Sequence, residues 1–324
     1  MKNVSIGKFR GLQQCATDRG AISVLALDHR TNLRNSLNPT DPKSVTDEQM
    51  MDFKCDVISS VGGACSAVLL DPEYGLANGI SCGALPGHTG LIATLDATGY
   101  TGESRARHSN LLEDWGIKKA RRMGANAVKL LVYYHPDSST AAEIESLVSK
   151  VGEECLQADI PFFLETLSYS LSTSSNKLSP DERRRVVIET ARRLTPLNVD
   201  VLKAEFPMDI SSEVNEVSWA KACAELSLAS VVPWVLLSAS VSFEIFLRQT
   251  TIACGKGASG VAVGRAVWQE AATMDGEARR NFLHTKVVER MNRVTAICNA
   301  LARSWTDFYK MKKPTTDWYR AYPE

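Results

Sequence analysis

The stretch DVLKAEFP, residues 200–207, has the pattern of a buried strand that is interrupted by a lysine and a glutamate. Side chains alternate along a strand, so Lys203 and Glu205 share one face. The other face carries the apolar Leu202 and Ala204, which suits packing beneath helices. Charged side chains are rarely buried unless they are paired or have a function. We therefore expect Lys203 and Glu205 to point into the interior of a barrel.

Similar short apolar runs recur along the chain and are separated by longer amphipathic stretches. Eight strands are predicted, at 21–28, 66–71, 90–96, 126–133, 160–166, 200–206, 233–238 and 259–264. Helices are predicted near 45–61, 111–124, 140–158, 180–195, 212–228, 242–256 and 277–302. Eight strand–helix units with right-handed crossovers close into a parallel (β/α)8 TIM barrel. We expect one α/β domain over residues 1–324, with a helical and aromatic C-terminal tail from about 277. The serine-rich stretch 168–178 is predicted to be a long loop at the catalytic end.

Charged residues from several predicted strands converge on one end of this barrel. The alternation that orients Lys203 also places Asp28, Lys129 and Glu165 on the inward faces of the first, fourth and fifth strands. A single lysine in a strand is usually part of a structural ion pair. Charge contributed by four strands to one end of a barrel is better explained by a functional site.

Two buried lysines with neighbouring carboxylates fit the chemistry of a class I aldolase. A buried amine becomes a nucleophile when desolvation or a neighbouring cation favours its neutral form, and Lys129 could supply that cation to Lys203. The amine then forms an imine (Schiff base) with a ketone, and the imine stabilises a carbanion on the adjacent carbon. Glu165 could assist dehydration and proton transfer, and Asp28 could take a hydroxyl proton during C–C cleavage.

The last two predicted strands offer an anion site. They end in LSASVS (237–242) and GVAVGRAVW (260–268), where many barrels bind phosphate through loop N–H groups and a short helix. Gly264 permits close backbone approach and Arg265 offers a guanidinium for phosphate. Further substrate contacts are expected from His29 and Arg30, which follow the first strand, and from Glu205.

Composition and motifs exclude several other classes of protein. Lys plus Arg and Asp plus Glu both number 37, so the zero net charge gives no support to a nucleic-acid or anionic-membrane partner. No apolar run reaches the length of a membrane span, and the N-terminal sequence lacks the apolar core of a signal peptide. The eight cysteines are scattered without a CxxC pair, which is typical of reduced thiols in a cytoplasmic protein. The five histidines lack metal-ligand spacing and no nucleotide-binding glycine motif is present, so neither a metal nor a cofactor is expected.

These segments together resemble the tagatose 1,6-bisphosphate aldolase family, class I lyases on a (β/α)8 barrel. The resemblance is carried in order along the chain by ALDHR (26–30), LLDPEYG (69–75), TGYTG (98–102), AVKLLVYYHPD (127–137), DIPFFLETLSY (159–169), DVLKAEFP (200–207), LSASVS and GVAVGRAVW. It implies that Lys203 forms the Schiff base, with active-site roles for Asp28, Lys129 and Glu165. It also implies that Ser238, Gly264 and Arg265 hold the phosphate next to the ketone.

The resemblance implies cleavage of tagatose 1,6-bisphosphate to dihydroxyacetone phosphate and glyceraldehyde 3-phosphate, as in lactose and galactose catabolism. It also implies a homo-oligomer, a dimer or a tetramer. Two positions depart from the family pattern, which usually has glutamine in place of His29 and glycine in place of Ser240. Two alternatives stay open. One is the related 6-deoxy-6-sulfofructose-1-phosphate aldolases, whose substrate carries a sulfonate, and the other is a regulator that binds a sugar phosphate without turnover.

Overall fold

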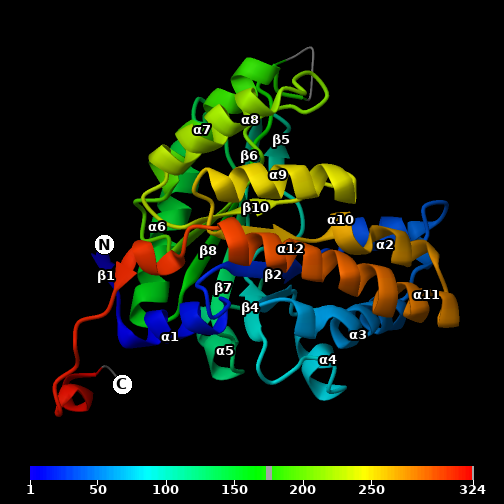
Figure 1. Ribbon diagram of the computed structural model, residues 1–324, viewed down its shortest axis with the longest axis horizontal. Helices are drawn as coiled ribbons and strands as arrows, with labels where there is room; N and C mark the ends of the chain where they lie inside the picture. The colour runs from blue at the N-terminus through cyan, green and yellow to red at the C-terminus, as the bar shows by residue number, and fades with distance from the viewer. Residues whose placement is uncertain (173–176, 323–324) are drawn as a thin grey trace.

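A closed barrel of eight parallel strands forms the centre of the computed structural model, which describes residues 1–172 and 177–322 (Figure 1). Around the ring the strands run in the order β10-β11-β2-β3-β4-β7-β8-β9. Their bounds are β2 (Ile22–Ala26), β3 (Ala67–Leu70), β4 (Gly90–Thr94), β7 (Ala127–Tyr133), β8 (Phe162–Leu167), β9 (Val201–Ala204), β10 (Trp234–Leu237) and β11 (Gly260–Val263). Each lies within or overlaps one predicted strand, so the predicted (β/α)8 barrel is confirmed.

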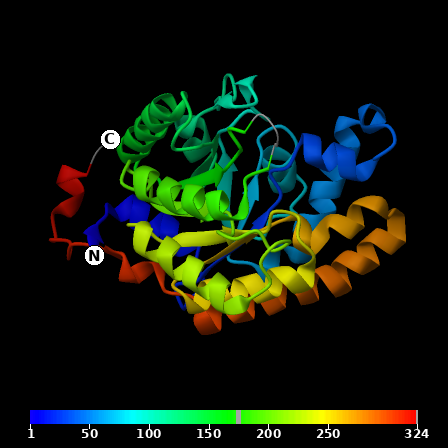
Figure 2. The same ribbon diagram turned by 90° about the horizontal axis from the view of Figure 1, so that it is seen from above.

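Helices form a layer around the strands, as the view from above shows (Figure 2). They are α1 (Ile6–Gln14), α2 (Thr31–Leu37), α3 (Asp47–Val61), α4 (Leu76–Ser81), α5 (Ile117–Arg122), α6 (Ala141–Gln157), α7 (Pro180–Leu194), α8 (Glu216–Ala229), α9 (Phe243–Gly255), α10 (Arg265–Trp268), α11 (Gly276–Phe282) and α12 (Val288–Leu301). Local sequence sets several ends. Thr46 and Gln49 form a capping box before α3, and Ser179 accepts a hydrogen bond from the Glu182 amide at the start of α7.

The structure differs from the prediction between β4 and β7. The predicted helix 111–124 is confined to α5, and an antiparallel hairpin of β5 (Thr101–Glu103) and β6 (Ala106–His108) precedes it. The backbone of residues 111–112 cannot form helical hydrogen bonds, because Leu111 forms a β-bridge with Asp96 and the Leu112 amide donates to the Leu95 carbonyl. The helix therefore begins only at Ile117.

Two further differences concern helices. The helices α1, α2, α4 and α10 are additions that the prediction lacked. The predicted long helix 277–302 is present as α11 and α12 joined by a π-helical turn over 283–287, in which Leu283 and Val287 are buried. The central part of the predicted loop 168–178, residues 173–176, lies outside the described residues.

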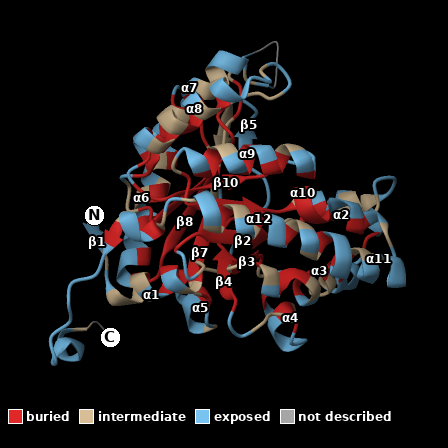
Figure 3. Cartoon of the chain, viewed as in Figure 1, coloured by how far each residue is buried: buried red, intermediate tan, exposed pale blue. Residues whose placement is uncertain are grey.

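The barrel strands are buried along both faces, whereas the helices bury only their inner sides (Figure 3). In β9 and β10 every residue is buried. Charged side chains among these strands therefore lie away from bulk water. Lys129 is 1% exposed, Lys203 5% and Glu165 7%, so the sequence-based expectation that these side chains point inward agrees with the structure.

The amino-terminal end of the barrel is closed by the two ends of the chain. β1 (Lys2–Asn3) pairs in parallel with β12 (Tyr309–Lys310). Lys8 of α1 forms a buried ion pair of 2.6 Å with Asp200, whose carboxylate also accepts from the Phe162 amide. The Tyr309 hydroxyl donates to the Asp200 carbonyl, so the predicted tail packs against the start of β9. Within the described residues, no helix has the length and apolar character needed to span a membrane.

Candidate active site

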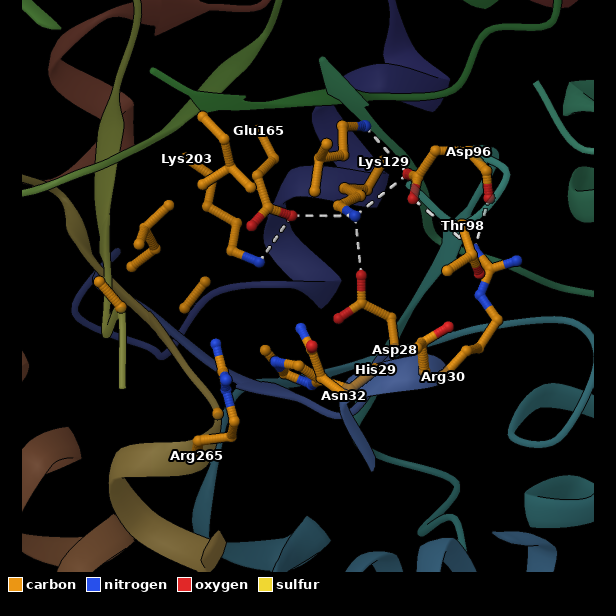
Figure 4. Close-up of a pocket in the computed structure, with 18 of the residues that line it drawn as sticks. Asp28, His29, Arg30, Asn32, Asp96, Thr98, Lys129, Glu165, Lys203 and Arg265 are labelled. Carbon is orange, nitrogen blue, oxygen red and sulfur yellow. Dashed lines mark hydrogen bonds and ion pairs between the residues drawn. The ribbon is translucent and has the colours of Figure 1, made fainter. Parts of the chain in front are cut away.

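A cavity of about 640 Å³ opens at the carboxyl ends of the barrel strands (Figure 4). It is the end at which barrel enzymes carry their catalytic residues. Side chains reach the cavity from around the ring. They include Asp28 after β2, Asp96 after β4, Lys129 on β7, Glu165 on β8, Lys203 on β9, Ser238 after β10 and Arg265 after β11. The sequence-predicted catalytic residues are thus brought together in one cavity.

Lys129 lies at the centre of the charged groups in this cavity. Its Nζ atom donates to Asp28 Oδ2 at 2.7 Å and to Asp96 Oδ1 at 3.1 Å. The same nitrogen lies 2.9 Å from Glu165 Oε2. Three carboxylates therefore surround this ammonium group, which explains why a fully buried lysine is tolerated.

Lys203 contacts the same carboxylate from the next strand. Its Nζ atom lies 2.8 Å from Glu165 Oε2, so one oxygen lies between two amines (Figure 4). Glu165 and Lys203 are register partners in β8 and β9, which places their side chains on the same face of the sheet. The strand pairing itself therefore sets this contact.

The charges in the cavity shift the pKa values of several groups. Burial tends to lower the pKa of Lys129, but Asp28, Asp96 and Glu165 outweigh it and raise that pKa well above its usual range. Burial tends to raise the pKa of Glu165, but Lys129 and then Lys203 hold it below its usual range. The same balance lowers the pKa of Asp28, again chiefly through Lys129. Both carboxylates are therefore ionised at neutral pH.

Asp96 is the functional-site residue that the sequence analysis missed. Its Oδ1 atom accepts hydrogen bonds from Lys129, from the Leu131 amide at 2.9 Å and from the Thr94 hydroxyl at 2.5 Å. It thereby orients Lys129 against Asp28. The available signal was the aspartate that ends GLIATLD (90–96) in the same way that Asp28 ends AISVLALD (21–28).

The predicted anion-binding residues also lie together. The Gly264 amide donates to Ser238 Oγ at 3.3 Å, and Arg265 begins α10 and points into the cavity (Figure 4). A Cβ atom at Gly264 would lie 2.8 Å from His29 Cε1 and 2.9 Å from the Ala26 carbonyl oxygen, so only glycine fits there. Among the hydrogen bonds and ion pairs of the described residues, none involves the Arg265 guanidinium, which leaves that cation available to a ligand.

His29 lies against this anion site with an unpaired nitrogen. Its ring packs edge-on against Trp268, with 5.3 Å between the ring centroids. Its Nδ1 atom is buried and has no hydrogen-bond partner among the residues that the structure describes. Burial lowers the pKa of His29 to about 4, and although Asp28 opposes the shift, the cations of Arg265 and Lys203 add to it. The imidazole is therefore neutral at pH 7, with both donor and acceptor capacity.

Two other predicted substrate contacts, Arg30 and Glu205, form ion pairs and hydrogen bonds with other residues of the chain. Arg30 lines the cavity, but its guanidinium forms a 2.6 Å ion pair with Glu73 and donates to the Asp96 carbonyl. Glu205 is not among the residues that line the cavity. Its carboxylate accepts from the Ser168 amide at 2.7 Å and from Arg183 at 3.2 Å. A role of Glu205 in binding substrate stays a prediction.

Across residues 1–172 and 177–322 we find no group of three or more histidine, cysteine, aspartate or glutamate side chains arranged to hold a metal ion. The buried charges of the cavity are compensated by one another.

Comparison with known proteins identifies the family. The model of the DeoC/LacD family aldolases matches residues 22–270, from the first barrel strand to just beyond α10. The chain belongs to the DeoC/LacD aldolase family. The match contains the whole barrel and every charged residue that lines the cavity.

Curated relatives of this aldolase extend over nearly the full chain. The tagatose 1,6-diphosphate aldolase of Staphylococcus haemolyticus is 33% identical over 319 residues, which cover 92% of this chain and 97% of the relative. The tagatose 1,6-diphosphate aldolase of Lactococcus lactis subsp. lactis is 32% identical over 324 residues, with 93% and 98% covered. The family resemblance inferred from the sequence is confirmed.

Solved structures confirm the fold of the aldolase. An archaeal fructose-1,6-bisphosphate aldolase, whose catalytic lysine is covalently bound to the carbinolamine intermediate, matches with a TM-score of 0.61 at 20% identity, covering 89% of this chain and 98% of that one. Fructose-bisphosphate aldolase from Plasmodium falciparum matches with a TM-score of 0.70 at 11% identity, covering 93% and 98%. Both likenesses concern the barrel architecture.

Proposed function

We propose that the chain is a class I aldolase that cleaves a ketohexose 1,6-bisphosphate, with tagatose 1,6-bisphosphate as substrate. The observation that carries the proposal is the buried contact between Lys203 Nζ and Glu165 Oε2 at the carboxyl end of the barrel. It joins a nucleophile to a proton carrier, as imine chemistry requires. The names of the curated relatives support the choice of substrate.

In the proposed reaction, the neutral amine of Lys203 attacks the C2 ketone of the substrate. Glu165 carries a proton from the attacking nitrogen to the carbonyl oxygen, which gives the carbinolamine. It then delivers a second proton, taken up from water, to the departing hydroxyl, so that water leaves and a protonated imine forms. The 2.8 Å separation of the two side chains suits this transfer. The positive imine then draws electrons from the neighbouring C3–C4 bond.

Cleavage of that bond needs a base for the C4 hydroxyl. Asp28 is proposed to accept this proton while the C3–C4 electrons move to the imine nitrogen, which releases glyceraldehyde 3-phosphate and leaves an enamine. Protonation of the enamine at C3 and hydrolysis of the imine then free dihydroxyacetone phosphate and Lys203. Lys129, fixed by three carboxylates, supplies a permanent positive charge that contacts substrate hydroxyls and keeps Asp28 ionised.

The phosphate next to the ketone is proposed to bind at Ser238, Gly264 and Arg265. Among the described residues, the Arg265 guanidinium has no hydrogen bond or ion pair, and a Cβ atom at Gly264 would clash with its neighbours; both observations support this assignment. His29 is proposed to contact the substrate through Nδ1, which has no hydrogen-bond partner in the part of the chain that the structure describes. Arg30 and Glu205 are retained as proposed substrate contacts, although each is engaged by protein groups in the described structure.

Borohydride trapping tests the central claim. Incubation with tagatose 1,6-bisphosphate and sodium borohydride should leave one reduced adduct on the peptide that contains Lys203. Lys203→Ala should abolish both adduct and turnover, whereas Lys221→Ala, a change of an exposed lysine on α8, should preserve both. An adduct on another lysine, or turnover by Lys203→Ala, would overturn the proposal.

The second candidate is cleavage of 6-deoxy-6-sulfofructose 1-phosphate. The sequence VVPWVLLSAS (231–240) resembles the seventh strand of aldolases that act on this sulfonate. Parallel assays of the two substrates separate the candidates, because the better substrate should show the larger kcat/KM. Binding of both sugars without cleavage of either would instead support a regulator that lacks turnover.

The proposal also includes a cytoplasmic location and a homo-oligomer. All eight cysteines of the chain are free, as is usual in a reducing compartment. Val217 and Leu228 of α8 are 76% and 86% exposed, and burial of such side chains favours self-association. Light scattering should report a dimer or a tetramer, and Leu228→Glu should lower the mass towards that of a monomer.

A further inference from the structure

Two cysteines lie side by side on helices outside the barrel, and neither of them lines the active-site cavity. Cys55 is on α3 and Cys82 caps the end of α4, and their Sγ atoms are 2.7 Å apart. This separation is closer than a resting thiol contact and longer than the covalent bond of about 2.05 Å. The two sulfurs therefore need only a small movement to bond.

The surroundings of this pair leave it open to a dissolved oxidant. Cys82 is exposed and Cys55 is half-buried, whereas the other cysteines are buried: Cys15, Cys65, Cys155, Cys223, Cys254 and Cys298. Asn78 donates to Cys55 Sγ at 3.1 Å, which fixes that sulfur opposite its neighbour. Burial, Cys82 and the carboxylates of Asp52 and Asp56 raise the pKa of Cys55 to about 12. Cys82 is the exposed sulfur of the pair, so a dissolved oxidant reaches it first.

We propose that Cys55 and Cys82 form a reversible disulfide that joins α3 to α4. With glutathione disulfide as oxidant, the Cys82 thiolate attacks one sulfur of that disulfide and expels one glutathione thiolate, which takes up the proton. Cys55 then loses its proton and attacks Cys82 Sγ in the mixed disulfide, which expels the second glutathione. The protein thiols lose two electrons and two protons in total, and glutathione disulfide gains them.

The bridge would act on segments that support the active site. Lys54, the neighbour of Cys55, donates to the Leu27 carbonyl at 2.9 Å and pairs with Asp71. Glu73, which precedes α4, holds Arg30 at 2.6 Å. A covalent link between α3 and α4 therefore restrains the loop over 71–75 without touching Lys203. The expected result is higher thermal stability with unchanged chemistry at the amine.

Mass spectrometry of the full chain tests the inference directly. After treatment with glutathione disulfide, the intact mass should fall by about 2 Da and digestion should yield a peptide that links residues 55 and 82. The melting midpoint should rise by about 5 °C and return with dithiothreitol. kcat should change by less than twofold.

Variants distinguish this pair from the buried cysteines. Cys55→Ser and Cys82→Ser should each remove the link and the rise in melting midpoint, while Cys223→Ser keeps both. A linked peptide that lacks residue 55 or 82, or a stable mixed disulfide with glutathione on Cys82, would overturn the inference. Because the test measures mass and melting midpoint, a negative result would leave the proposed aldolase activity unaffected, and loss of that activity would leave the disulfide inference unaffected.

Discussion

Glu165 and Lys203 are opposite each other on adjacent strands, and the carboxylate of Glu165 also contacts Lys129. One carboxylate oxygen thus serves two amines that have different surroundings. Lys129 is held by three carboxylates, whereas the only carboxylate within ion-pair distance of Lys203 in the described part of the chain is Glu165. In the proposed reaction, a substrate carbonyl therefore competes with a single partner for the Lys203 nitrogen, and this difference in partners supports different roles for the two lysines.

Glu165→Gln should reduce kcat by about 10²- to 10⁴-fold, because the amide cannot carry a proton between the nitrogen and the departing hydroxyl. Rapid-quench kinetics should show slower imine formation, measured as borohydride-trappable protein. Glu189→Gln, which alters a carboxylate on the outer helix α7, should keep normal turnover. Equal trapping rates in Glu165→Gln and the native protein would contradict the assigned role.

Lys129→Met should destabilise the protein and abolish useful activity. It leaves Asp28, Asp96 and Glu165 close together without their common cation, and removal of one partner from a buried ion network costs about 3–5 kcal/mol. Urea unfolding measures the loss. Lys118→Met, a substitution of an exposed lysine on α5, is the matched control and should change the free energy of unfolding by less than about 0.5 kcal/mol.

His29→Gln should weaken the pH dependence of stability between pH 6.5 and pH 4. The folded protein lowers the pKa of His29 from 6.5 to about 4, so in this window the unfolded state binds more protons and stability falls as the pH falls. The shift corresponds to roughly 3 kcal/mol at the acidic end, which glutamine removes. Urea unfolding at pH 7.0 and pH 4.5 measures the difference, with exposed His88→Gln as control. Parallel pH curves for the native protein and His29→Gln would show that the imidazole does not titrate in this way.

Ser240→Gly should stabilise the protein by about 1 kcal/mol. Ser240 has φ of +61°, a left-handed conformation that costs a residue with a Cβ atom roughly 1–2 kcal/mol and glycine almost nothing. Thermal unfolding checks the sign. Ser59→Gly, on the exposed face of the regular helix α3, should instead lose about 0.5 kcal/mol, and equal losses in both variants would exclude strain at Ser240.

Glu205→Gln should lower the free energy of unfolding by about 1–3 kcal/mol, because the charged bonds to Ser168 and Arg183 are weakened. Because Glu205 is also a proposed substrate contact, KM should rise by more than about tenfold. A KM that changes by less than threefold would show instead that Glu205 only ties the end of β8 to α7.

Most of the barrel could be predicted from the sequence because its strands are short apolar runs with a fixed alternation. That alternation also gave the inward direction of Lys129, Glu165 and Lys203, all of which lie within strands. The hairpin β5–β6 and the late start of α5 could not be predicted. The backbone of Leu111 and Leu112 pairs with Asp96 and Leu95 after β4, and no local sequence pattern indicates this pairing.

The site was predicted less completely where residues follow strands. Asp96 lies beyond the end of β4, where alternation no longer fixes direction, and its importance comes from the position of Lys129 on β7. Arg30 and Glu205 were predicted as substrate contacts. Their pairing with Glu73 and Arg183 depends on the placement of α4 and α7, which local sequence does not encode.

The buried carboxylate of Asp200 lies three residues before Lys203 and binds Lys8 and the Phe162 amide, while its carbonyl accepts from Tyr309. Segments from the beginning, middle and end of the chain therefore meet on the strand that carries Lys203, the proposed Schiff-base residue. In a laboratory selection for altered turnover, beneficial substitutions should consequently arise in the first helix and in the final segment as well as around the cavity. Because the Phe162 amide donates to the Asp200 carboxylate, its hydrogen-exchange rate should change in variants whose substitutions alter the packing around Asp200.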